Sequence, residues 1–289
     1  MKRRPPPILP TLAATLVAAL AISTLAVAPG ARAAADPGQV VDAEKAFSAD
    51  AGAMGVKRSF LKWAAPDAVV LEPDPVNAIE SYSKQGDDTG GPQLQWWPLW
   101  AGVASSGDLG FTTGPYSFDG KRRGHYFTVW ARQPDGRWKW IFDGGTSSDA
   151  TDEPDWRTPA AYLPPAAPAA GSAEAAMAEV AREEADLAKR AETDVRIAHL
   201  RHLSEDAHIQ ASANPPATHR AEFELELQVW PDAMKLAPLG GRAASGGDLV
   251  FTYGDARWSG GRGHYAHVWQ KRAAGWKLVF AELISVRSE

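Results

Sequence analysis

The chain has 289 residues, 45% of them hydrophobic and 22% charged, which is the ordinary balance of a globular protein. Its formal charge of −5 argues against binding to nucleic acid, because such proteins need a surplus of Lys and Arg to displace counterions. Cysteine is absent, and this excludes disulfides, thiol catalysis, a lipid-modified cysteine and every Cys-based metal site.

The N-terminus has the features of a signal peptide. Basic residues at positions 2–4 precede an almost unbroken apolar run over 11–27, and Ala31-Arg32-Ala33 has the small-x-small pattern that signal peptidase accepts. A retained membrane anchor is the alternative, although the run is Ala-rich and short for a span of ~20 residues. We therefore predict a signal peptide over 1–33, a periplasmic or secreted mature protein, and no membrane contact after cleavage.

The next segment has the pattern of helices followed by a strand. Apolar residues between Val40 and Met54 recur every three or four positions, which predicts a helix with one buried face. Gly55 interrupts this pattern, and residues 56–65 have the composition of a second, short helix. A first strand is expected over 68–71.

Three β-rich runs follow at 109–113, 126–132 and 137–142. Between the last two, Gln133-Pro134-Asp135-Gly136 has the composition of a turn, in which Pro fixes φ and Gly accepts a positive φ. The pattern predicts antiparallel strands, with the helices packed on one face of a curved sheet.

A segment rich in Pro and Ala divides the chain. Residues 153–176 contain five Pro and nine Ala with little apolar periodicity, which is typical of a stiff, solvated linker. Beyond it, the sequence predicts a long and a short helix over 177–203 and strands over 265–271 and 276–283. The predicted boundaries are 37–150 for the first domain, 151–172 for the linker and 173–289 for the second domain.

The two predicted domains are copies of each other. SGDLGFTTGPY at 106–116 recurs as GGDLVFTYGD at 246–255, and RGHY at 123–126 recurs at 262–265. Val-Trp and Trp-Lys pairs farther along recur in the same order with nearly the same offset. A fixed offset over several ordered blocks indicates an internal duplication.

These blocks resemble the nuclear transport factor 2-like superfamily, and within it the SnoaL-like and ketosteroid-isomerase-like bacterial branch. The resemblance covers nearly all of the mature chain, once per domain. It implies an α+β fold of two tandem cone-shaped α+β barrel domains, each with N-terminal helices packed on a curved antiparallel sheet. Enzymes of the family use a Tyr and one or two Asp inside the cone for proton transfer beside a carbonyl. The matching blocks build the sheet, so they leave the chemistry open.

Three polar residues of the first domain are candidates for catalysis. His125 could act as an acid or base near neutral pH, and His125-Tyr126 recurs as His264-Tyr265. Asp143 has Ala281 as its counterpart in the second domain, which would suit a single working pocket. The alternatives are a histidine packed at a sheet edge and an aspartate at an exposed strand end.

Aromatic residues mark a candidate binding surface. Trp96, Trp97 and Trp100 lie between the first strand and the duplicated block. They could line an apolar pocket, face the other domain, or simply belong to the core.

A cluster of histidines in the second domain is a candidate metal site. His199, His202 and His208 lie near Glu205 and Asp206, and the first two are about one helical turn apart. No counterpart exists in the first domain, so we interpret them as polar replacements on a partly exposed helix. We predict no metal and no cofactor.

The preferred functional hypothesis is an exported protein that binds a small apolar molecule in a cup-shaped pocket of the first domain. One alternative is a non-catalytic protein-interaction module whose domains form an internal pseudo-dimer. Another is an isomerase, cyclase or dehydratase that uses a Tyr/His/Asp set in the pocket. Pairing of the two domains through their sheets would leave the chain a monomer.

Overall fold

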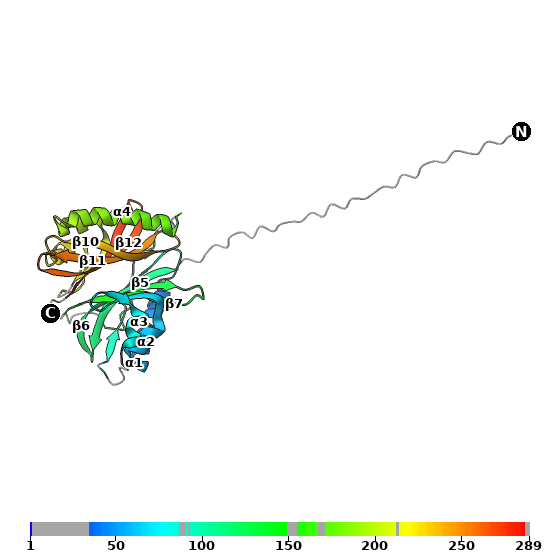
Figure 1. Cartoon of the computed structure of the whole chain (residues 1–289), viewed down its shortest axis with the longest axis horizontal. Coiled ribbons are helices and arrows are strands. Elements are labelled where there is room, and N and C mark those ends of the chain that lie inside the picture. The colour runs from blue at the N-terminus through cyan, green and yellow to red at the C-terminus, as the bar shows by residue number, and fades with distance from the viewer. Residues whose placement is uncertain are drawn as a thin grey trace. The chain divides into compact units, whose positions relative to one another are not determined.

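The computed structural model describes residues 1, 35–86, 91, 93–148, 155–166, 171–211 and 214–286 (Figure 1). Those from Ala35 onward belong to one compact unit. The signal peptide predicted over 1–33 lies outside the described residues, apart from Met1. No helix in the described part of the chain is both long and apolar enough to cross a membrane.

The first half contains three helices and an eight-stranded sheet. The sheet order is β2-β1-β7-β6-β5-β4-β8, with β3 also paired to β5. Strand β1 runs parallel to β7, whereas β5, β6 and β7 are antiparallel neighbours. The elements are α1 (Gly38–Met54), α2 (Val56–Trp63), β1 (Ala64–Leu71), β2 (Pro75–Asn77), α3 (Ala78–Lys84), β3 (Leu94–Trp96), β4 (Trp100–Val103), β5 (Leu109–Phe118), β6 (Lys121–Arg132), β7 (Trp138–Ser147) and β8 (Ala161–Tyr162).

The second half repeats this plan with a five-stranded sheet in the order β10-β11-β12-β13-β9. Strand β9 runs parallel to β13, as β1 does to β7. Helix α4 lies across the sheet that contains β10, β11 and β12 (Figure 1). The elements are α4 (Ala173–Ala191), α5 (Val195–His202), β9 (Leu203–Ala211), α6 (Arg220–Leu227), β10 (Lys235–Ala243), β11 (Leu249–Trp258), β12 (Gly261–Arg272) and β13 (Gly275–Val286).

The predicted helices and hairpins of the first half are present, with small boundary differences. Helix α1 ends where predicted, because Gly55 adopts φ 92 and ψ 157, a conformation that favours glycine. Helix α2 ends at Trp63, so the short helix predicted over 56–65 was two residues too long. The turn at 133–136 joins β6 to β7, and Gly136 has the expected positive φ of 84.

The segment predicted as a solvated linker is partly built into the fold. Ala161–Tyr162 pair with β4 as a short parallel strand. Leu163, the next residue, is buried beside the first sheet. Pairing to an available sheet edge satisfies backbone groups that a free linker would leave to water.

Aromatic side chains join the two sheets. The rings of Phe127 and Phe280 stack with centroids 4.0 Å apart, and those of Phe142 and Phe251 lie 5.0 Å apart. Phe127, Phe251 and Phe280 belong to one continuous cluster of buried apolar residues. The faces of the two sheets that contact each other are therefore part of the core.

Candidate active site

The first half contains a small pocket that is lined mainly by residues of its sheet. The cavity has a volume of about 280 Å³. Its walls are mostly aromatic, and its polar side chains are Tyr116 of β5, Tyr126 of β6 and Asp143 of β7. The lining residues are Phe60, Leu94, Trp96, Tyr116, Phe118, Tyr126, Asp143, Gly144 and Gly145.

The alternation of strand β6 decides which of its side chains reach this pocket. Successive side chains of a strand point to opposite faces of the sheet. Tyr126 lines the pocket, whereas the next residue, Phe127, stacks on the second half. His125 lies on the same face as Phe127, and it does not line the pocket. Its ring is buried, and burial, with a contribution from the charge of Arg122, lowers its pKa to about 3. The structure therefore separates the predicted His125 from Tyr126 and Asp143.

Asp143 is a neutral acid in this environment. Its carboxylate oxygen Oδ2 accepts a hydrogen bond of 2.8 Å from the Thr128 hydroxyl. Burial among the pocket's rings raises the pKa of Asp143 to about 8, and the nearby charge of Glu44 adds to this rise. At neutral pH the side chain is thus mostly protonated and can donate a hydrogen bond.

A second buried carboxyl, Glu44 of α1, lies close to the first. It is fully buried and accepts hydrogen bonds from the indole of Trp96 at 2.5 Å, the indole of Trp130 at 2.8 Å, and the Thr112 hydroxyl. Burial raises the pKa of Glu44 to about 7, against the opposing effect of these donors.

Sequence reasoning missed Glu44, although a signal was present. Glu44 lies within the apolar face of α1, four residues after Val40 and three before Phe47. A charged residue at such a position needs buried partners. The same residue type recurs as Glu184 in α4, which is also buried.

The hydroxyl of Tyr126 is buried, with the Thr112 side chain as its polar neighbour. The Tyr126 side chain is 6% exposed, and burial raises its pKa far above the usual value. Tyr126 lines the pocket, but its hydroxyl oxygen is covered in the free protein, so a bound molecule reaches it only when a neighbouring side chain moves.

The three candidate tryptophans have different surroundings. Trp96 lines the pocket. Trp97 lies with Trp156 in a second groove of about 820 Å³, which Trp96 also lines, and the guanidinium of Arg122 lies 5.0 Å from the Trp97 ring centroid. Trp100 stacks on His208 of the second half at 3.7 Å. Only Trp96 therefore joins Tyr126 and Asp143.

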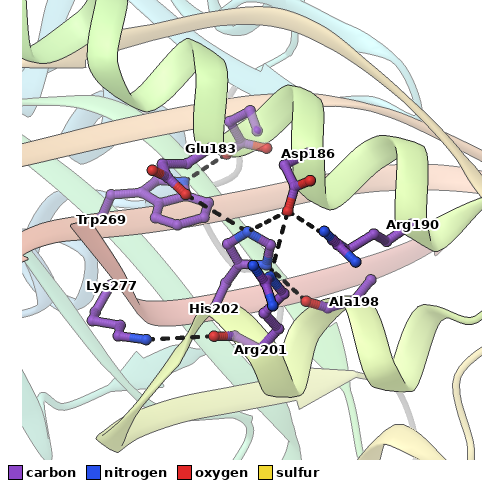
Figure 2. Close-up of polar contacts among 9 residues, drawn as sticks. Glu183, Asp186, Arg190, Ala198, Arg201, His202, Trp269 and Lys277 are labelled. Carbon is purple, nitrogen blue, oxygen red and sulfur yellow. Dashed lines mark hydrogen bonds and ion pairs between the residues drawn. The ribbon is translucent and has the colours of Figure 1, made fainter. Parts of the chain in front are cut away.

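The three histidines of the candidate metal cluster have different surroundings. His202 Nδ1 lies 2.8 Å from the carbonyl oxygen of Ala198, and its Nε2 lies 3.4 Å from a carboxylate oxygen of Asp186 (Figure 2). His199 makes the same kind of contact to the carbonyl of Val195 at 2.7 Å. His208 stacks instead on a tryptophan. Within the described residues, no three His, Asp or Glu side chains are placed to hold a metal ion.

Comparison with known proteins gives matches in structure but not in sequence. No protein-family model and no curated protein matches the chain. A nuclear transport factor 2-like protein of unknown function from Pseudomonas putida is 12% identical, with a TM-score of 0.34, and the match covers 41% of this chain and 92% of that one. A protein of unknown function with a cystatin-like fold from Nostoc punctiforme is 10% identical, with a TM-score of 0.32 and coverage of 39% and 92%.

Some of the similar structures carry the names of enzymes. A candidate dehydratase of the nuclear transport factor 2-like family from Streptomyces avermitilis is 11% identical, with a TM-score of 0.32, and the match covers 40% of this chain and all of that one. Another is named as a candidate ketosteroid isomerase, from Kribbella flavida. The chain is a mixed α+β protein, and the solved structures similar to it include nuclear transport factor 2-like proteins, mostly of unknown function, whose matches cover about 40% of its length.

Proposed function

We propose that the pocket of the first half binds a small, largely apolar molecule that carries one carbonyl or similar acceptor. The observation that carries this proposal is the placement of Asp143 and Tyr126 in the lining of one aromatic-walled cavity. A few polar groups in an apolar pocket orient a ligand, while the apolar walls supply most of the affinity.

The polar pair suits a hydrogen-bond acceptor. An apolar site that keeps a carboxylic acid neutral lets it donate a hydrogen bond, and the Tyr126 hydroxyl is a second donor. A carbonyl oxygen accepts two hydrogen bonds through its two lone pairs. The volume of about 280 Å³ is at the lower end of ligand pockets, which favours a compact ligand.

Acid–base catalysis, as in an isomerase, cyclase or dehydratase, is the second candidate function. The neighbouring carboxyls Asp143 and Glu44 support it, since burial raises their pKa values to about 8 and about 7. A proton-transfer group works best when its pKa lies near the working pH. Asp143 is the member of the pair that lines the pocket, so it would exchange the proton with substrate.

Binding of acetophenone, compared with ethylbenzene, tests the proposal. The two probes have similar shapes, but only acetophenone has a carbonyl. We expect Tyr126→Phe to weaken acetophenone binding about two- to tenfold, the value of one hydrogen bond, and to leave ethylbenzene binding unchanged. Tyr162→Phe, on the exposed β8, is the matched control. Equal effects of Tyr126→Phe on both probes would contradict the proposal.

The repeated topology supports a further part of the proposal, that each half is one cone-shaped domain, over 37–150 and 173–289. In both halves a long helix, a short helix and a strand precede a run of antiparallel strands, and the first strand runs parallel to the last. Export through the signal peptide over 1–33 remains part of the same proposal, supported by its sequence features alone.

A further inference from the structure

Each half has a buried glutamate on its long helix, Glu44 in α1 and Glu184 in α4, and the two halves differ at a position beside it. Trp96 of β3 pairs with Tyr116 of β5, and Leu236 of β10 pairs with Ala256 of β11. Tyr116 and Ala256 are separated by 140 residues, the offset of the duplicated block. Leu236 therefore occupies in the second half the place that Trp96 has in the first.

This replacement removes a hydrogen bond. In the first half, the Trp96 indole is the donor to one oxygen of Glu44. In the second half, Oε1 of Glu184 accepts from Thr252 and Trp269, each at 2.6 Å, and lies 2.9 Å from Nδ1 of His267. Oε2 of Glu184 has no hydrogen-bond partner among the described residues, although the side chain is only 6% exposed. The leucine provides no donor for it.

A groove also lies beside Leu236, the smaller of the two side chains. A groove of about 740 Å³ lies between α4 and β10, and we call it the α4–β10 groove. Glu184 and Leu236 both line it. The rest of its wall is largely apolar and includes Met177, Ala185, Leu239 and Tyr265.

Glu184 presents a negative charge in this wall. Burial alone would raise its pKa, but the charge of His267 and the hydrogen bonds from its donors hold the pKa below the usual value. An ionised carboxylate oxygen forms its strongest hydrogen bonds with N–H and O–H donors. A ligand that suits the groove therefore has an apolar body and one hydrogen-bond donor.

We propose that the α4–β10 groove binds a flat aromatic molecule with an N–H or O–H donor, in the place that the Trp96 indole takes in the first half. Its donor bonds to Oε2 of Glu184, which is covered in the free protein and is reached when the Leu236 side chain moves aside, and its ring packs against α4. This site is separate from the pocket that holds Asp143 and does not depend on the function proposed for it.

Indole and 1-methylindole are the probes for the first experiment. Both are flat, and only indole has an N–H donor. We expect the full chain to bind indole at least tenfold more tightly than 1-methylindole in calorimetric titration, because a hydrogen bond to a charged group is stronger than a neutral one. Equal affinities, or no indole binding at millimolar concentration, would overturn the proposal.

Variants locate the binding site. Leu236→Trp supplies the side chain that the ligand replaces, so it should reduce indole binding at least tenfold. Ala185→Trp, at an exposed position of α4 that lines the groove, should block it without disturbing the core. Leu225→Trp is the matched control, since Leu225 of α6 is 66% exposed and outside the groove. Indole binding that survives Ala185→Trp would overturn the proposal, even if Leu236→Trp fails to fold.

Discussion

At the scale of single residues, the first pocket depends on Asp143, whose pKa burial raises to about 8, and on the neighbouring Glu44, whose pKa burial raises to about 7. The sequence led to Tyr126, Asp143 and Trp96, which the structure brings together. It also led to His125, which strand alternation places on the other face. Glu44 was missed because its role comes from tertiary partners, the indoles of two tryptophans and a threonine hydroxyl.

The raised pKa values predict how stability changes above neutral pH. Burial raises the pKa values of Asp143 and Glu282 to about 8, so the folded protein holds protons there that the unfolded chain releases near pH 4. Their stabilising contribution is complete at low pH and falls as pH rises toward 8, because the folded state then binds more protons than the unfolded state. We expect the free energy of unfolding to decrease from pH 6.5 to pH 8 in urea titrations and to level off above pH 8. Asp143→Asn should make this decrease shallower, and an unchanged slope would contradict the assignment.

Buried histidines predict the opposite trend on the acidic side. Burial lowers the pKa values of His125, His199 and His208 to about 3. Below pH 6.5 the unfolded chain protonates these rings and the folded protein does not, so the contribution of these three rings to stability should fall as pH decreases from 6.5 to 4. Urea titrations of His208→Gln over this range should show a smaller loss than the unaltered protein. A loss of the same size would mean that His208 does not remain neutral in the fold.

At the scale of elements, regular periodicity made the long helices and hairpins predictable, and irregular segments were not. The short strands β3 and β4 carry two tryptophans, Trp96 and Trp100, without a regular alternation, and they form because β5 offers an edge to pair with. Strand β8 forms by pairing with β4. Such elements depend on a sheet that is itself a product of distant sequence.

The break between α1 and α2 gives a prediction at this scale. Gly55→Ala should destabilise the protein by roughly 1–3 kcal/mol, because its φ of 92 and ψ of 157 are strained for other residues. Gly52→Ala is the control, since an added methyl group there meets no atom within 4 Å and Gly52 lies inside a helix. That change should be neutral or stabilising by up to ~1 kcal/mol. Chemical denaturation of both variants measures the difference, and equal effects would contradict this role for Gly55.

At the scale of the whole molecule, the contact between the two sheets makes the halves interdependent. Phe280 of β13 is fully buried and stacks on Phe127 of β6. Phe280→Ala should cost about 3–5 kcal/mol of stability, and hydrogen exchange should become faster in β6 as well as in β13. Val229→Ala, at a position 58% exposed, should change stability by less than ~0.5 kcal/mol. Faster exchange confined to the second half would show that the halves fold separately.

The same contact leads us to expect a monomer, because each sheet covers the other's apolar face within one chain. Light scattering of the purified protein should give the mass of a single chain. Mass spectrometry of protein from the periplasmic fraction should give an N-terminus within two residues of Ala34. A stable dimer would contradict the first expectation, and an intact Met1 on cytoplasmic protein would contradict the second.

The site proposed for the first half is a neutral carboxylic acid, Asp143, beside Tyr126 in one pocket. Carbon-13 NMR of the Asp143 carboxyl, assigned by comparison with Asp143→Asn and followed from pH 4 to pH 10, tests it most directly. The account predicts a titration midpoint near pH 8, set by burial and by the neighbouring Glu44. A midpoint below pH 5 would show that Asp143 is ionised at neutral pH and would contradict the proposed site.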